Sequence, residues 1–309
     1  MSGIENLQLN FSPESLTALN VVLAIIMFGV ALDIRLSDFR TVARSPKGPL
    51  IAVGTQILIV PALTVGLTFL LNPVPSIALG MILVACCPSG NMSNFLTHLA
   101  KGNTPLSIGT TALSTVAAVF VTPLSLAFWG SLNPSTAALL RSVALDPVHL
   151  LSTVLLILVL PLAVGIGVAS RFPAVAERLR TPVRRISLVF FVAFVAIALQ
   201  ANFDHFLTFI GFAFLAVLLQ NSMALATGYG VARVAGLPPA DVRAVSIEVG
   251  IQNSGLGLVL VFNFFDGSGG MALVAAWWGI WHIISGLGLA WFWSRRPLGE
   301  EPIRDTTPV

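Results

Sequence analysis

Nine apolar stretches, each about as long as a helix that crosses a bilayer, follow one another along almost the whole chain. A hydrocarbon core of about 30 Å requires roughly 20 apolar residues of helix. The stretches are rich in Leu, Val, Ala and Gly and lack the alternating pattern of an outer-membrane barrel. They predict an all-α polytopic membrane protein with about nine transmembrane helices, at residues 15–33, 48–71, 76–100, 103–133, 147–170, 185–203, 206–232, 240–265 and 267–294.

The composition argues against an ordinary soluble domain. Of the 309 residues, 56% are hydrophobic and 9% are charged, which is too little charge to cover a soluble surface. The longest polar linkers are the basic segments near 34–47 and 171–185, which we expect to be loops. We expect no separate soluble domain: residues 1–14 form a tail, 15–294 the transmembrane domain and 295–309 a second tail.

The basic residues predict the orientation of the chain, because cytoplasmic loops carry an excess of Lys and Arg. With nine spans, 15 of the 16 basic residues fall on one side and only Arg141 on the other. This bias puts the N-terminus outside and the C-terminus in the cytoplasm. Residues 1–14 lack a basic n-region, so no cleavable signal peptide is expected. The net charge of +3 is then a topology signal and does not indicate a nucleic-acid partner.

Two of the stretches are interrupted by polar residues and helix breakers. One reads "CCPSGNMSN" at 86–94, where Pro88 removes a backbone hydrogen bond and Gly90 loosens the turn. The other reads "SIEVGIQNSG" at 246–255. Paired interruptions of this kind indicate a transporter binding site, since non-helical backbone at membrane depth is tolerated only inside protein or beside a water-filled cavity. A simple kink in each helix is the alternative.

Glu248 is the only one of the 13 acidic residues that lies well within an apolar stretch. A charge at the centre of a membrane helix costs roughly 2.5–3.5 kcal/mol, so something must compensate it. One alternative is that Glu248, five residues beyond Arg243, reaches water near the start of its span. Gln252 and Asn253 argue against this, because they continue the polar line deeper into the stretch.

Other polar side chains in the stretches add to this inventory. Ser107 and Thr111 are four residues apart and share one helix face, while Gln56 stands alone in its stretch. Oxygen ligands with one carboxylate suit a hard cation. The sequence shows no Cys/His cluster of a zinc or copper site, no Walker loop for ATP and no arrangement typical of an intramembrane enzyme. We expect the adjacent Cys86 and Cys87 to be small packing residues without a disulfide.

The sequence resembles the bile acid:sodium symporter family over most of its length. The resemblance rests on "IMFGVALDIRLSDF" at 26–39, "CCPSGNMSNFLTHLAKGN" at 86–103, "SIEVGIQNSG" and "WHIISG" at 281–286. It implies two inverted repeats, about 15–133 and 147–294, a panel domain, a core domain and two broken helices that cross. Bacterial members usually have ten spans, so this chain is expected to lack their first helix.

The resemblance also implies two sodium sites and a substrate site. One sodium would bind Ser93, Asn94, Ser107, Thr111 and Glu248. The other would bind Gln56, Glu248, Gln252 and the backbone at Val249 and Ile251. Substrate would lie near Asn91, Asn253 and His282. Bacterial relatives often have Thr at the position of Asn91 and can have Asn at that of Ile283, so the substrate itself stays open.

These observations together predict a secondary active transporter that is not an enzyme. It would couple sodium to the symport of an organic anion, bile acid-like or a small carboxylate, across the plasma membrane, in a bacterium the inner membrane. The alternative is a proton-coupled transporter or antiporter in which Glu248 carries the proton. Sodium would be its only cofactor and the lipid bilayer its surroundings, without nucleic acid or ATP.

Overall fold

The computed structural model describes residues 21, 24–25, 27–142, 159–201 and 203–297. Some predicted segments lie outside these residues: the tail at 1–14, about half of the stretch at 15–33, the first part of the stretch at 147–170 and most of the tail at 295–309.

The described residues form helices, and their one β pairing is an isolated bridge. Residues 27–33 are helical and lead into the first named helix. The elements then follow in the order α2 (Leu36–Arg44), α3 (Lys47–Gly54), the π-helical turn η1 (Thr55–Ile59), α4 (Val60–Leu71), α5 (Pro75–Ala85), α6 (Met92–Leu99), α7 (Thr104–Ser131), α8 (Pro134–Ser142), α10 (Leu160–Arg171), α11 (Pro173–Ala201), α12 (Phe203–Val234), α13 (Pro239–Gly250), α14 (Ser254–Phe264) and α15 (Gly269–Ser294).

Within the described residues, four helical segments are long and apolar enough to cross a membrane: Lys47–Leu71, Thr104–Ser131, Ala213–Val234 and Gly269–Ser294. The two stretches predicted to be interrupted are each split into two shorter helices, α5 with α6 and α13 with α14. The all-helical prediction is confirmed, and the chain has the character of a multi-pass membrane protein.

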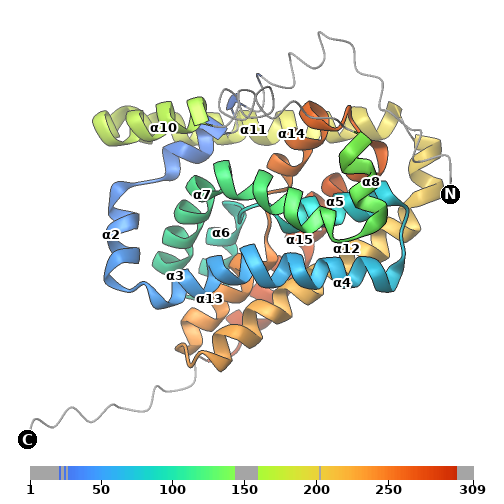
Figure 1. The fold of residues 1–309 in the computed structure, drawn as a ribbon. Helices are drawn as coiled ribbons and strands as arrows, with labels where there is room; N and C mark the ends of the chain where they lie inside the picture. Colours follow the sequence, from blue (N-terminus) through green and yellow to red (C-terminus); the bar gives the residue numbers. More distant parts are fainter. Residues whose placement is uncertain (1–20, 22–23, 26, 143–158, 202, 298–309) are drawn as a thin grey trace, which may run out of the picture.

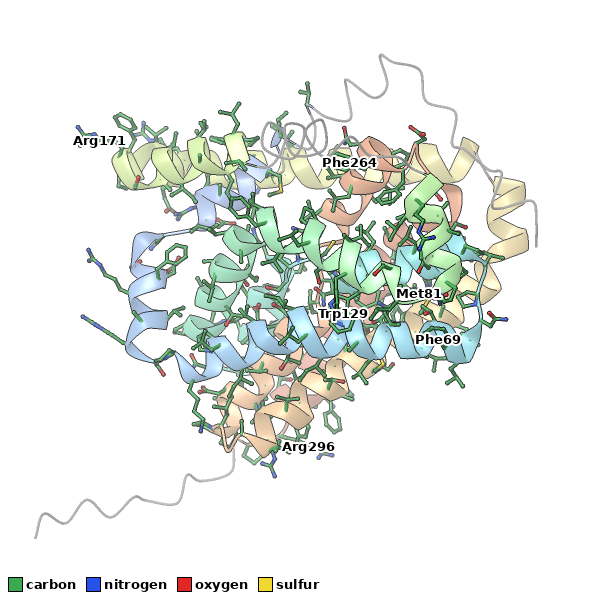
Figure 2. The ribbon with its side chains drawn as sticks, viewed as in Figure 1. Phe69, Met81, Trp129, Arg171, Phe264 and Arg296 are labelled. Atoms are coloured by element: carbon green, nitrogen blue, oxygen red, sulfur yellow. The ribbon has the colours of Figure 1, made fainter. Side chains whose placement is uncertain are left out.

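Large apolar side chains cover the outside of the bundle. Phe69 on α4 and Phe120 on α7 are more than half exposed, whereas Met81 on α5 is fully buried. Figure 2 labels Phe69 at the edge of the bundle and Met81 inside it. A soluble protein rarely exposes so many large apolar side chains, whereas lipid tails accept them.

The packing at the centre is close because small residues permit it. A Cβ on Gly80 of α5 would lie 2.8 Å from the Cα of Met271 on α15, so the two helices touch backbone to backbone. Trp278 of α15 is fully buried in the hydrophobic cluster that also contains Met271. The second broken helix is packed in the same way, since α12 runs along α13 (Figure 1). This packing holds the broken helices at the middle of the bundle.

The prediction of loops at the two basic segments is wrong. Residues 34–47 contain the amphipathic helix α2, whose first turn is closed by the Arg35 N–H donating to Asp38 Oδ2 at 2.7 Å. Residues 171–185 lie almost wholly in α11, which begins at Pro173. Arg, Leu and Ala are good helix formers and Pro is favoured in the first turn, so charge alone did not prevent helix formation.

Candidate functional site

The two broken helices meet at their breaks. Ser89 and Gln252 form the isolated antiparallel bridge. The Gly90 N–H donates to Ile251 O at 3.0 Å, and the Asn253 N–H donates to Pro88 O at 2.8 Å. These two bonds satisfy backbone groups that the broken helices leave open. The predicted interruptions at both segments are confirmed, and the alternative of simple kinks is wrong.

Four half-helix ends converge at this meeting point. α5 and α13 end there at Ala85 and Gly250, and α6 and α14 begin there at Met92 and Ser254. Helix C-termini present carbonyl groups with partial negative charge, while N-termini present N–H groups with partial positive charge. The meeting point therefore offers backbone partners to both cations and anions.

Glu248 lies in the last turn of α13 and is fully buried. Three hydroxyl groups donate to its carboxylate. Ser93 Oγ is 2.5 Å from Oε1, Thr111 Oγ1 is 3.0 Å from Oε1 and 3.1 Å from Oε2, and Ser107 Oγ also bonds Oε1. The alternative in which Glu248 reaches water is inconsistent with this burial.

Asn94 completes the group around Glu248. Its Oδ1 lies 2.8 Å from Ser107 Oγ and 3.2 Å from Thr111 Oγ1, so it competes with the carboxylate for the single proton of each hydroxyl. Ser93 and Asn94 are adjacent in the first turn of α6, and Ser107 and Thr111 are one turn apart on α7. The structure thus brings together all five residues of the first expected set, from three helices.

The described residues contain three ion pairs, and none of them involves Glu248. They also contain no group of three or more His, Cys, Asp or Glu side chains that could hold a metal ion. The buried charge is surrounded instead by neutral hydroxyl and amide groups. Such a site attracts a cation, because a buried carboxylate costs free energy until it is paired.

The second expected set lies directly beside Glu248. Gln56, in the π-turn η1, donates from Nε2 to Glu248 O at 2.7 Å, and Gln252 donates from Nε2 to Val249 O at 3.1 Å. Both amide oxygens, Gln56 Oε1 and Gln252 Oε1, are buried without a hydrogen-bond partner. The carbonyl of Ile251 accepts the Gly90 N–H. Two buried oxygens without donors are free to bind a cation.

The three expected substrate residues are not joined by hydrogen bonds in the described structure. Asn91 donates from Nδ2 to Asp33 Oδ2 at 3.3 Å. Asn253 caps α14, its Oδ1 accepting from the Leu256 N–H at 3.0 Å. His282 is buried in the middle of α15, and its Nδ1 has no partner.

Sequence reasoning missed several polar residues at the meeting point. Ser89 and Ser114 hydrogen-bond each other at 3.1 Å. Asn221 of α12 donates to Gly250 O at 2.8 Å and accepts from Ser285 Oγ at 2.6 Å. The signal for Asn221 was available, since "LQNS" at 219–222 interrupts an otherwise apolar stretch.

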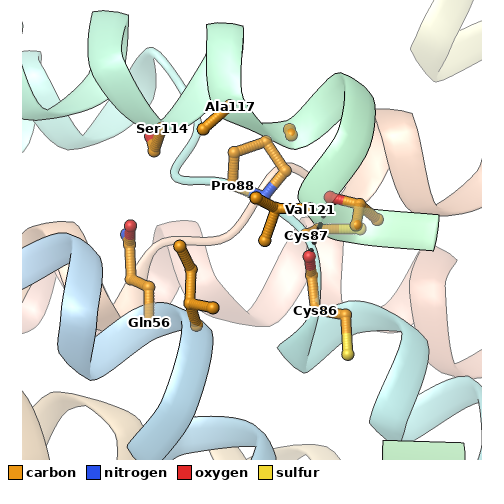
Figure 3. A pocket seen from close by; sticks show the side chains of 10 residues that line it. Gln56, Cys86, Cys87, Pro88, Ser114, Ala117 and Val121 are labelled. Atoms are coloured by element: carbon orange, nitrogen blue, oxygen red, sulfur yellow. Dashed lines mark hydrogen bonds between the residues drawn. The ribbon is translucent and has the colours of Figure 1, made fainter. Parts of the chain in front are cut away.

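A small pocket, with room for about one water molecule, adjoins the first break, between η1 and α7. Figure 3 shows Gln56 on one side of it, Pro88 near its middle and Ser114 across from Gln56. Cys86 and Cys87 also line it, and both thiols are free. The pocket therefore reaches Gln56, whose Oε1 has no partner.

Residues 20–209, more than half of the chain, match the model of the sodium bile acid symporter family. The chain belongs to this family. The uncharacterized sodium-dependent transporter YocS of Bacillus subtilis is 33% identical over 90% of this chain and 83% of its own length. The resemblance found in the sequence is confirmed.

Two further relatives come from eukaryotes. A probable chloroplastic sodium/metabolite cotransporter of Arabidopsis thaliana is 33% identical over 89% of this chain, which spans 66% of that protein's length. The ileal sodium/bile acid cotransporter of Cricetulus griseus is 25% identical over 79% of this chain and 69% of its own length. Symporters of this family depend on sodium, and these relatives are transporters.

Proposed function

We propose that this protein is a secondary active transporter that couples sodium to the uptake of an organic anion across the plasma membrane. The observation that carries the proposal is Glu248, a fully buried carboxylate bonded by three hydroxyl groups and free of any ion pair in the described residues. A hard cation with oxygen ligands satisfies this arrangement. The names of the relatives favour sodium over the proton-coupled alternative.

The proposal assigns two sodium ions. The first binds among Ser93, Asn94, Ser107, Thr111 and Glu248. The second binds between the unpartnered amide oxygens of Gln56 and Gln252, with the backbone carbonyls of Val249 and Ile251. The carboxylate of Glu248, shared by the two cations, offsets the electrostatic repulsion between them.

The anion is assigned to the same meeting point, near Asn91, Asn253 and His282. The N-termini of α6 and α14 point their N–H groups there, which favours negative charge. The relatives' names include bile acids and metabolites, so the panel to test contains bile acids and small carboxylates. Sodium-gradient-driven uptake of at least one such anion into proteoliposomes tests the proposal, and uptake driven by a pH gradient alone would contradict it.

The proposed architecture has nine spans in two inverted repeats, about 15–133 and 147–294, with a core that moves against a panel. In this scheme the N-terminus lies outside and the C-terminus lies in the cytoplasm, as the basic bias indicates. Reporter fusions at residue 1 and after Arg304 are expected to report opposite sides of the membrane. Two reporters on the same side would contradict the odd number of spans.

Ser107→Ala is expected to lower sodium affinity moderately while the maximal uptake rate is kept. The substitution removes one neutral hydroxyl from the first sodium site, worth about 1 kcal/mol or roughly fivefold in affinity. Uptake measured against sodium concentration gives the half-saturating value. Ser131→Ala, on the same helix but bonded only to Phe128 O, is the control and should match the wild type; an unchanged affinity in Ser107→Ala would remove this hydroxyl from the site.

Transport of a monovalent anion is expected to carry an inward current. Two sodium ions with one monoanion move one net positive charge per cycle, so a potential of about 100 mV adds roughly 2.3 kcal/mol to the driving force. Uptake into proteoliposomes should therefore rise when the interior is made negative with a potassium gradient and valinomycin. Uptake that is indifferent to the potential would contradict the two-sodium stoichiometry for a monoanion.

A further inference from the structure

A carboxylate of the protein itself lies against Asn91. Asp33, the last residue of the helical segment 27–33, accepts a hydrogen bond from Asn91 Nδ2 at its Oδ2, 3.3 Å away. Its other oxygen, Oδ1, is 3.5 Å from Nε of Arg180 on α11. One carboxylate is thus held between an amide donor at the first break and a guanidinium from a distant part of the chain.

Two further contacts, one to the backbone and one to a carboxylate, hold the Arg180 side chain in place. Its Nε also donates to Leu32 O at 3.0 Å, and its Nη1 pairs with Glu177 Oε2 at 2.5 Å. Its side chain is 18% exposed, against 39% for Asp33. The guanidinium is therefore the more firmly held partner, whereas the carboxylate of Asp33 borders open space.

From this geometry we propose that Asn91 and Arg180 form a carboxylate-binding subsite that the carboxylate of Asp33 fills in this structure. An amide N–H and a guanidinium on either side of a planar carboxylate are the partners that such an anion prefers. A carboxylate substrate takes the same donors once Asp33 moves aside. The inference rests on the proposed function and names a carboxylate as the group recognised.

The competing explanation is that Arg180 only caps the helical segment 27–33 through Leu32 O, with Asp33 as its counter-ion. Capping of helix C-termini by Arg is common. The two explanations differ in one respect. In a subsite, loss of the Asp33 charge leaves the Arg180 guanidinium, then paired with Glu177 alone, accessible beside position 91, where it attracts small anions from water. In a cap, the guanidinium stays turned toward Leu32 O and does not act on position 91, so that removing Arg180 leaves the labelling of position 91 unchanged.

The test is a reporter thiol at position 91 in a chain whose two native cysteines are replaced by Ala. Asn91→Cys is labelled in sodium-free buffer with two methanethiosulfonate reagents of similar size, one carrying a sulfonate and one a trimethylammonium group. In each reaction the thiolate attacks the thiosulfonate sulfur, forms a mixed disulfide and releases methanesulfinate. The ratio of the sulfonate rate to the ammonium rate reports the local charge.

Adding Asp33→Asn is expected to raise this ratio roughly tenfold, because one negative charge close to the thiol is removed. Adding Arg180→Gln to that variant should reverse the rise. Asp266→Asn, an exposed change in the turn between α14 and α15, is the matched control and should leave the ratio unchanged. A rise that Arg180→Gln does not reverse, an unchanged ratio in the Asp33 variant, or a thiol that neither reagent reaches would overturn the subsite.

This labelling needs neither sodium nor transport, so its outcome is independent of the coupling ion. Failure of the labelling test alone would leave sodium-coupled transport intact and remove only the subsite. Failure of sodium-driven uptake with a successful labelling test would keep the anion subsite and overturn the coupling.

Discussion

Glu248→Gln is expected to abolish sodium-driven uptake while the protein still folds and inserts. The substitution keeps the size of the side chain and one oxygen acceptor for Ser93, Ser107 and Thr111, but removes the negative charge that these hydroxyl groups surround. A full charge at contact distance from a cation in a protein interior is worth several kcal/mol, on the order of a hundredfold or more in affinity. Uptake against sodium concentration, measured in proteoliposomes, should fall to the level of protein-free vesicles.

Two further variants make this result interpretable. Glu248→Asp keeps the charge but withdraws it by one methylene, so it should retain sodium dependence at higher sodium concentrations. Size-exclusion chromatography and thermal unfolding of the Gln variant should match the wild type, since a neutral side chain is cheaper to bury than a charged one. A Gln variant with the sodium dependence of the wild type would remove Glu248 from the ion site.

The breaks in the two crossing helices could be predicted from the sequence because their chemistry is local. Pro88 and Gly90 interrupt the first helix, and Asn253 starts the next half-helix by capping it. Helix boundaries in strongly apolar stretches were also close, with 103–133 expected and α7 running over Thr104–Ser131. Local propensity and the length of a bilayer span determine these features.

The partners of the crossing residues could not be predicted from local pattern. The shared face of Ser107 and Thr111 follows from their spacing, but their contact with Glu248 joins residues 141 and 137 positions apart. Only the resemblance to a family implied that contact. The hydrogen bond from Asn91 to Asp33 was missed, because nothing in either segment specifies which residue of the other lies opposite.

The π-turn at Thr55–Ile59 shows the same limitation. Gln56 was expected to contribute to an ion site, yet the sequence around it reads as plain apolar helix. In the structure, one π-helical turn, η1, interrupts the α-helix here. Gln56 lies in this turn and donates to Glu248 O. Turns of this kind are rare and often occur at functional sites, and they depend on tertiary contacts that a single segment does not encode.

Arg243 is buried in the structure, which its position in the sequence does not indicate. In the sequence it counts among the basic residues that indicate the cytoplasmic side. In the structure it is buried, and its guanidinium donates to three backbone carbonyls: Ala100 O at 2.8 Å, Trp293 O at 3.0 Å and Arg296 O at 3.0 Å. These carbonyls lie at the C-terminal ends of α6 and α15, where a cation also complements the helix dipoles.

Arg243→Met is therefore expected to lower the free energy of unfolding by about 1–3 kcal/mol, because the buried carbonyl of Ala100 loses its side-chain donor. Trp293 O keeps the Arg296 N–H as a partner and Arg296 is exposed to water, so the loss falls mainly on Ala100 O. Thermal unfolding in detergent, followed by tryptophan fluorescence, measures the change. Arg233→Met removes the same charge from an exposed position on α12 and should have little effect, while Arg243→Lys, with fewer donors, should lie between. Equal destabilisation by the Arg233 and Arg243 changes would mean that net positive charge, and not the three carbonyl contacts, accounts for the stability.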